Sequence, residues 1–159
     1  MRAIPIIGVT GAGKTCAVWA TLIEMVRTRK LTPDQIVTGT EQDLLVPASK
    51  VSDYQSANTK GTWRSIVPHT TKVVFVDEVG MALYSSPQVR TAVWLGLLSR
   101  VEKLGACLFL TSNHSLPEVY ELVGAAAASR LSGMTGMPTD FPGWQTGTTD
   151  WRTGINRAR

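Results

Sequence analysis

The chain has 159 residues, 43% of them hydrophobic and 18% charged, which is enough for one α/β domain with a core and too few for two ordinary domains. The formal net charge of +4 is compatible with a nucleic-acid partner and equally with many enzymes that bind none. No apolar stretch reaches the roughly 18 residues of a membrane span, and the residues before Gly8 are too few for a signal peptide. We therefore expect one cytoplasmic domain over residues 1–159, without membrane contact.

The amino-terminal third predicts a strand, a glycine-rich loop, a helix and a second strand. The apolar run Ala3–Ile7 predicts the first strand, and the helix is expected from about Gly13 to Lys30. Proline removes a hydrogen-bond donor from a sheet, so Pro5 must lie at the start of the strand or where its nitrogen faces no acceptor. Ile36–Thr38 predicts the second short strand.

The middle of the chain has a weaker pattern, followed by a clear strand and helix. A short helix is expected within 47–57. The β-branched and aromatic run Lys72–Val76 is typical of a strand buried on both faces of a parallel sheet. A helix should run from Pro87 to Leu104, with Ser86 as its cap and Gly105 as its stop.

The last third predicts one more strand, one helix and an irregular tail. Cys107–Leu110 is the strand, and the capping box of Ser115 and Glu118 begins a helix that reaches about Leu131. The tail, 132–159, is rich in Gly, Thr and Pro and is expected to hold at most one short strand. Because strands alternate with helices, the predicted fold is an α/β parallel sheet covered by helices on both faces.

The run Gly8–Thr15 has the spacing Gly-x-x-x-x-Gly-Lys-Thr of a phosphate-binding loop. This spacing places backbone N–H groups around a β-phosphate at a helix amino terminus, where the helix dipole favours negative charge. We expect Lys14 to reach the β- and γ-phosphates and Thr15 to ligate Mg²⁺. The absence of an Asn-Lys-x-Asp guanine-reading motif favours ATP. The expected nucleotide contacts are Gly8, Thr10, Gly11, Ala12, Gly13, Lys14, Thr15 and Cys16.

Polar residues at two later strand ends complete a candidate hydrolytic site. Asp77 is interpreted as the acid on the metal side and Glu78 as the base on the water side, so that hydrolysis is favoured over phosphate transfer to a metabolite. Asn113 follows the next strand, where its amide could hold the attacking water, although asparagine is also a common turn residue. His114 receives no role, since a lone loop histidine is more often solvated.

The two cysteines carry no predicted chemistry. Cys16 lies just after the phosphate loop and Cys107 begins an apolar run, so both are interpreted as small buried hydrophobic residues rather than a disulfide or a metal pair.

Two arginines admit a structural and a functional interpretation. Arg130 closes the predicted last helix, where a cation is favourable beside the helix carboxyl end, and it could equally act as an arginine finger for a neighbouring subunit. Arg152 follows Trp151 in the tail, where an ordinary surface charge is the default.

Five segments together resemble the DnaC/IstB-like AAA+ ATPases, which are replicative helicase loaders and transposition helpers. They are Gly8–Thr15, Val76–Gly80, Leu110–Asn113, Ala128–Leu131 and Asp150–Arg152, in that order. The resemblance covers residues from about Ile4 to Arg152. It implies Walker A residues at Lys14 and Thr15, the Walker B pair at Asp77 and Glu78, a first sensor at Asn113, a finger at Arg130 and a second sensor at Arg152.

The same resemblance implies partners. A ring or spiral of copies is expected, with a replicative helicase or other replication protein as partner. Because the chain begins just before its first strand, the partner surface would lie on the core or tail, or the chain is a minimal phage-type version, or it acts beside another subunit. Single-stranded DNA is the expected nucleic acid, since no duplex-reading motif occurs. Candidate DNA contacts are Lys50, Lys60, Arg64 and Lys72, with Tyr54 and Trp63 available for stacking.

These observations predict an AAA+-type ATPase that binds ATP and Mg²⁺ and uses hydrolysis to change its grip on DNA or on a replication partner. Three alternatives remain open at this point. A small-molecule kinase shares the phosphate loop, but no arginine cluster of a lid is visible. A filamentous-phage assembly ATPase would normally carry a transmembrane segment. A non-catalytic adaptor would use ATP only to order a binding surface.

Overall fold

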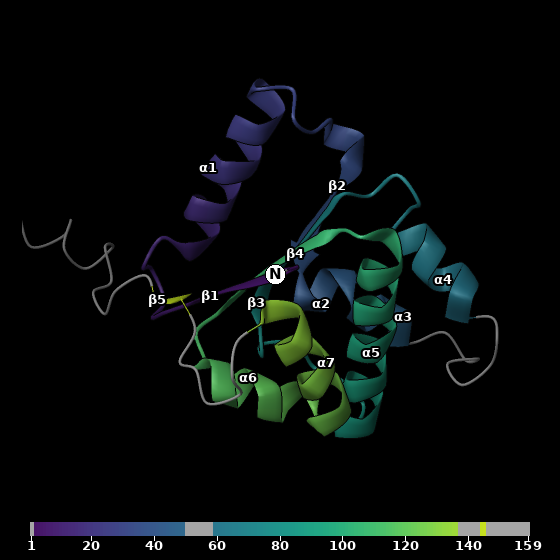
Figure 1. Ribbon diagram of the computed structural model, residues 1–159. Coiled ribbons are helices and arrows are strands. Elements are labelled where there is room, and N and C mark those ends of the chain that lie inside the picture. The colour runs from purple at the N-terminus through teal and green to yellow at the C-terminus, as the bar shows by residue number, and fades with distance from the viewer. Residues whose placement is uncertain (1, 50–58, 137–143, 146–159) are drawn as a thin grey trace, which may run out of the picture.

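A parallel five-stranded sheet organises the computed structural model, which describes residues 2–49, 59–136 and 144–145 (Figure 1). The strand order is β2-β3-β4-β1-β5, and every pairing is parallel. The predicted parallel α/β fold is confirmed. The strands are β1 (Ala3–Ile7), β2 (Ile36–Thr40), β3 (Val73–Val79), β4 (Cys107–Ser112) and β5 (Trp144–Gln145).

Helices cover both faces of the sheet, unequally. On one face α1 packs against Phe75 and Phe109, while the longest helix, α5, lies on the opposite face with α6 and α7 (Figure 1). These helices are α1 (Lys14–Arg27), α5 (Pro87–Leu104), α6 (Leu116–Val123) and α7 (Ala125–Thr135). Shorter ones are a 3₁₀ turn (Pro33–Gln35), α2 (Glu41–Leu44), α3 (Val46–Ser49) and α4 (Thr59–Ile66). None of the described helices has both the length and the apolar character that a membrane crossing requires.

Local signals set the bounds of α5 as the sequence predicts. The Ser86 hydroxyl oxygen accepts a hydrogen bond from the Val89 N–H at 3.2 Å, and Pro87 occupies the first turn. Gly105 ends the helix with a φ of 64°, in the left-handed region. Along the helix, Trp94 and Leu98 are among the residues that are fully buried against the sheet.

Pro5 stands in the middle of β1, not at its start. The Arg2 carbonyl accepts from the Leu108 N–H of β4, and the Gly8 N–H donates to the Ser112 carbonyl. Since backbone groups alternate along a strand, the nitrogen of Pro5 faces away from β4. The proline therefore removes no hydrogen bond from the β1–β4 ladder.

The prediction of one unbroken helix from Ser115 to about Leu131 is wrong in one respect, because the helix is interrupted at Gly124. Gly124 has a φ of 83° and a ψ of 155°, which is backbone that only glycine adopts readily, and a Cβ there would clash with the Thr91 side chain of α5. The second piece, α7, continues to Thr135, so the predicted tail is helical at its start. Arg130 lies within α7 and does not close it.

The weakly patterned middle region differs most from the prediction. Helix α3 covers only the start of the expected 47–57 helix, and residues 50–58 lie outside the described residues. Helix α4 was not predicted. Its Trp63 is 5% exposed and packs where Gly96 of α5 has no side chain, so the expected stacking of Trp63 on bases is wrong.

We predict that Gly124→Ala lowers the free energy of unfolding by about 2 kcal/mol or more, because the new Cβ meets Thr91 in backbone that disfavours side chains. Urea titration followed by circular dichroism measures this. Gly133→Ala is the matched control on α7, with open space around its Cβ, and it should be neutral or stabilising by up to about 1 kcal/mol. Equal effects of the two substitutions would contradict this explanation of the α6–α7 break.

Candidate nucleotide-binding site

The phosphate loop joins the end of β1 to the first turn of α1. Gly11 and Gly13 both take left-handed backbone, with φ of 77° and 80°, and Gly13 is the residue before the helix. The Gly8 N–H donates to the Ser112 carbonyl at 3.2 Å, which ties the start of the loop to the end of β4. The loop therefore presents unpaired N–H groups of a helix amino terminus at the carboxyl edge of the sheet.

Lys14 is buried inside this loop. Its ammonium nitrogen donates to the carbonyls of Gly8 and Val9 and to Oδ1 of Asn113, each at 2.8 Å. Burial lowers the pKa of Lys14, while the nearby carboxylates of Asp77 and Glu78 act in the opposite direction. The cation is thus held between the loop and β4, where a bound phosphate would add negative charge.

The Asp77 carboxylate of β3 accepts hydrogen bonds from side chains of two other elements, α1 and β4. The Thr15 hydroxyl of α1 donates to Oδ1 and Oδ2 of Asp77 at 2.9 and 3.0 Å, and the Thr111 hydroxyl of β4 donates to Oδ1. The Glu78 N–H also donates to Oδ1, at 3.1 Å. Hydroxyl and carboxylate oxygens are the ligands that Mg²⁺ takes, so the Thr15 and Asp77 side chains fit the metal that the sequence predicts.

Glu78 sits in an unusual backbone conformation. Its φ of 56° is left-handed, and the pairing register between β3 and β4 shifts between Val76 and Val79. Such backbone costs a residue with a side chain about 1–2 kcal/mol, and strained residues of this kind cluster at functional sites. The Thr111 hydroxyl oxygen accepts from the Glu78 N–H at 3.2 Å and helps to hold the bulge.

These groups line one cavity of about 300 Å³. The structure therefore brings together most of the predicted nucleotide, metal and catalytic residues, from the phosphate loop, α1, β3 and the end of β4. The lining residues are Thr10, Gly11, Gly13, Lys14, Thr15, Cys16, Asp77, Glu78, Thr111, Ser112 and Asn113. Thr111 and Ser112 were not predicted, although both belong to the strand end that precedes Asn113.

The interpretation of the cysteines as buried is wrong for Cys16 and holds in part for Cys107. Cys16 is exposed on α1 at the rim of the cavity, because the helix turns this position away from the sheet. Cys107 is half-buried, and its partial burial raises the pKa of its thiol.

Arg130 lies apart from the cavity lining. Its guanidinium donates to the Ser99 hydroxyl of α5, and its Nε is 3.6 Å from Oε2 of Glu102. The side chain is 39% exposed. Arg130 is therefore presented at a surface formed by α5 and α7, and no described contact joins it to the phosphate loop.

The remaining predicted residues fall into two groups. Arg64 and Lys72 are exposed, as DNA contacts would have to be. Arg152, Lys50, Tyr54 and the side chain of Lys60 lie outside the described residues.

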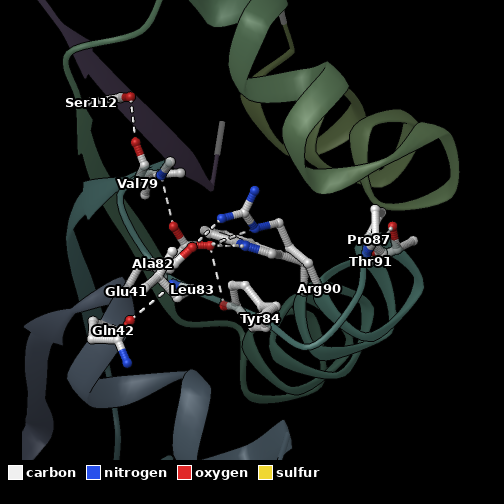
Figure 2. A network of polar contacts seen from close by, with 12 residues as sticks. Glu41, Gln42, Val79, Ala82, Leu83, Tyr84, Pro87, Arg90, Thr91 and Ser112 are labelled. Atoms are coloured by element: carbon white, nitrogen blue, oxygen red, sulfur yellow. Dashed lines mark hydrogen bonds and ion pairs between the residues drawn. The ribbon is translucent and has the colours of Figure 1, made fainter.

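Sequence reasoning missed Glu41, the first residue of α2. It is 1% exposed, and its carboxylate accepts hydrogen bonds from residues of the β3–α5 connection and of α5 (Figure 2). The available signal was an acidic residue directly after the strand β2, in a segment whose pattern was otherwise weak.

Comparison with known proteins finds likeness only at the level of structure. No protein-family model matches the chain, and no curated protein matches it. The DnaC helicase loader superposes with a TM-score of 0.61 at 16% identity, over 84% of this chain and 75% of that one. DnaI superposes with a TM-score of 0.61 at 18% identity, over 94% and 72%. The chain has a DnaC-like AAA+ fold.

Replication initiator proteins share this fold. DnaA bound to AMPPCP and single-stranded DNA superposes with a TM-score of 0.58 at 19% identity, over 83% of this chain. The chain spans less than two fifths of the DnaA chains that it matches, namely 37% and 38%. The fold implied by the resemblance of the five sequence segments is thus confirmed.

We predict that Lys14→Ala weakens binding of AMPPCP about tenfold or more, because charge-assisted hydrogen bonds to phosphate are lost. Isothermal titration calorimetry measures the dissociation constant. Lys30→Ala removes an exposed lysine just after the same helix and should leave the affinity within about twofold, as expected for a solvated surface charge. Equal AMPPCP affinities of the unsubstituted chain, Lys14→Ala and Lys30→Ala would contradict the phosphate role of Lys14.

Proposed function

We propose that this chain is a Mg²⁺-dependent ATPase of the AAA+ type that assists DNA replication, by loading or remodelling a helicase or by binding single-stranded DNA. The observation that supports it best is a pair of hydrogen bonds beside the phosphate loop, from Lys14 to Asn113 and from Thr15 to Asp77. In that loop Gly11 and Gly13 adopt left-handed backbone. The four bonded side chains combine a phosphate-binding cation, oxygen ligands for a metal and an amide at one cavity.

The chemistry assigned to each side chain follows from its place. Lys14, which donates to the loop carbonyls, would contact phosphate oxygens, and Thr15 and Asp77 would hold the metal. When bound, Mg²⁺ supplies neutralisation of charge on the β- and γ-phosphates. The exposed Glu78 carboxylate orients the attacking water and accepts its proton, with the Asn113 amide as a second contact to that water.

Arg130 acts in this proposal from a neighbouring copy in a ring or spiral. Its exposure and its separation from the cavity of its own chain suit a group that completes the site of another. The contacts to Ser99 and Glu102 do not oppose this, since an exposed ion pair contributes at most about 1 kcal/mol. A finger arginine accelerates phosphoryl transfer by about 10³-fold or more.

The partners are proposed from the structural neighbours. DnaC is a helicase loader, and one DnaA structure contains single-stranded DNA. We extend these partner classes to this chain, with the exposed Arg64 and Lys72 as candidate phosphate contacts. Arg152 is retained as the proposed second sensor.

The function is tested by ATP turnover of the chain and of Glu78→Gln. Loss of a positioned general base should lower turnover about 100-fold or more while AMPPCP affinity stays within about threefold. Glu24→Gln is the matched control, because Glu24 is an exposed acid on α1 that pairs only with Arg27 among the contacts described. It should retain full turnover.

The outcomes separate the competing functions. An unsubstituted chain that binds AMPPCP and shows no turnover, with or without single-stranded DNA, would point to a nucleotide-gated adaptor and contradict the ATPase. Transfer of the γ-phosphate to a nucleoside or nucleotide acceptor, in place of release as inorganic phosphate, would instead establish a kinase.

A further inference from the structure

Glu41 places a buried carboxylate next to the β3–α5 connection, outside the nucleotide cavity. It directly follows β2, and 1% of the residue is exposed. Oε2 accepts from the Gly80 N–H at 2.7 Å, whereas Oε1 accepts from the Trp94 indole at 2.8 Å and the Tyr84 hydroxyl at 3.2 Å (Figure 2). Each carboxylate oxygen therefore has its own donor, as a buried charge requires.

The charge of Glu41 is balanced by Arg90 of α5. The Arg90 Nε lies 3.7 Å from Oε1 of Glu41, and the guanidinium stacks over the Tyr84 ring at 4.9 Å (Figure 2). The Arg90 guanidinium also donates to the carbonyl of Ala82. Removing one partner of such a buried pair leaves the other charge uncompensated. Glu41 and Arg90 together fix the path of the connection between β3 and α5.

This path begins two residues after Glu78. Gly80 has a φ of 102°, and a Cβ there would clash with His114, so the backbone approaches the β4–α6 loop closely. The carbonyl of Val79 accepts from the Ser112 hydroxyl at 2.6 Å. The short segment from Glu78 to Gly80 is thus held from the β4 side by Thr111 and Ser112, and from the α2 side by Glu41.

We propose that Glu41 is a positioning residue for hydrolysis, which fixes the Gly80 N–H and thereby the left-handed backbone that places the Glu78 carboxylate in the nucleotide cavity. The proposal rests on the ATPase function proposed above. It adds a residue that touches neither nucleotide nor metal. Without the bond to Glu41, the bulge loses its restraint on one side and Glu78 can relax toward ordinary strand backbone.

Glu41→Gln is an informative substitution because it keeps the size of the side chain. Its amide group replaces one of two accepting oxygens, so that either the Gly80 N–H or the Trp94 indole faces another donor. Arg90 loses its counter-charge at the same time. Gln42→Ala is the matched control: Gln42 is the next residue of α2, and its Oε1 accepts from the Leu83 N–H at 2.9 Å, beyond the Glu78–Gly80 segment.

The experiment measures kcat and KM for ATP and the AMPPCP dissociation constant for each chain. We expect Glu41→Gln to lower kcat about tenfold or more with KM and AMPPCP affinity within about twofold, since a small misplacement of a catalytic group affects the chemical step. Gln42→Ala should keep kcat within about twofold. Hydrogen exchange should also show a faster Gly80 amide in Glu41→Gln only.

The other outcomes are distinct. Unchanged kcat in Glu41→Gln, with Glu78→Gln inactive, overturns the inference and leaves the ATPase intact. A parallel loss of kcat and AMPPCP affinity shows a merely structural role and also overturns it. Absence of turnover in the unsubstituted chain removes both proposals. If Glu41→Gln does not fold, Tyr84→Phe deletes one donor to Glu41, and it should lower kcat about threefold with unchanged KM; unchanged kcat there overturns the inference.

Discussion

The carboxylate of Asp77 is the point at which the sheet, the phosphate-loop helix and the bulge of β3 meet. It accepts from Thr15 on α1, from Thr111 on β4 and from the backbone of Glu78. This is possible because β1, β3 and β4 are parallel, so that their carboxyl ends share one edge of the sheet. Lys14 adds a second connection across the same edge through Asn113. The geometry of the cavity follows from the hydrogen bonds to Asp77 and from the bond between Lys14 and Asn113.

Several features in and beside the site are unfavourable for the stability of the fold. Glu78 adopts left-handed backbone, Lys14 is a buried cation, and Glu41 and Arg90 form a buried pair beside the β3–α5 connection. Burying charges is unfavourable unless each finds partners, and here each does. The pattern is expected where the fold must hold side chains in positions that they would not adopt alone.

Features with a local cause were predictable from the sequence, and features with a distant cause were not. The phosphate loop, Asp77, Asn113 and the caps of α5 depend on spacing and on residues within one turn, so the sequence predicts them. The break at Gly124 depends on the Thr91 side chain of α5, and the burial of Trp63 depends on the space at Gly96. Glu41 shows the same limit, since its partners lie in the β3–α5 connection and in α5. The functional role of Arg130 cannot be derived from a single chain, because its proposed target is the nucleotide site of a second copy.

The most direct test of the account is therefore ATP turnover in an equimolar mixture of Glu78→Gln and Arg130→Ala chains, compared with each variant alone. Each variant alone lacks either the Glu78 carboxylate or the Arg130 guanidinium at every site and should be nearly inactive. In the mixture, an Arg130→Ala chain contributes an intact cavity and a Glu78→Gln neighbour contributes an intact arginine, so turnover should return. A mixture no more active than the mean of its components, or full activity of Arg130→Ala by itself, would contradict a site completed by two copies.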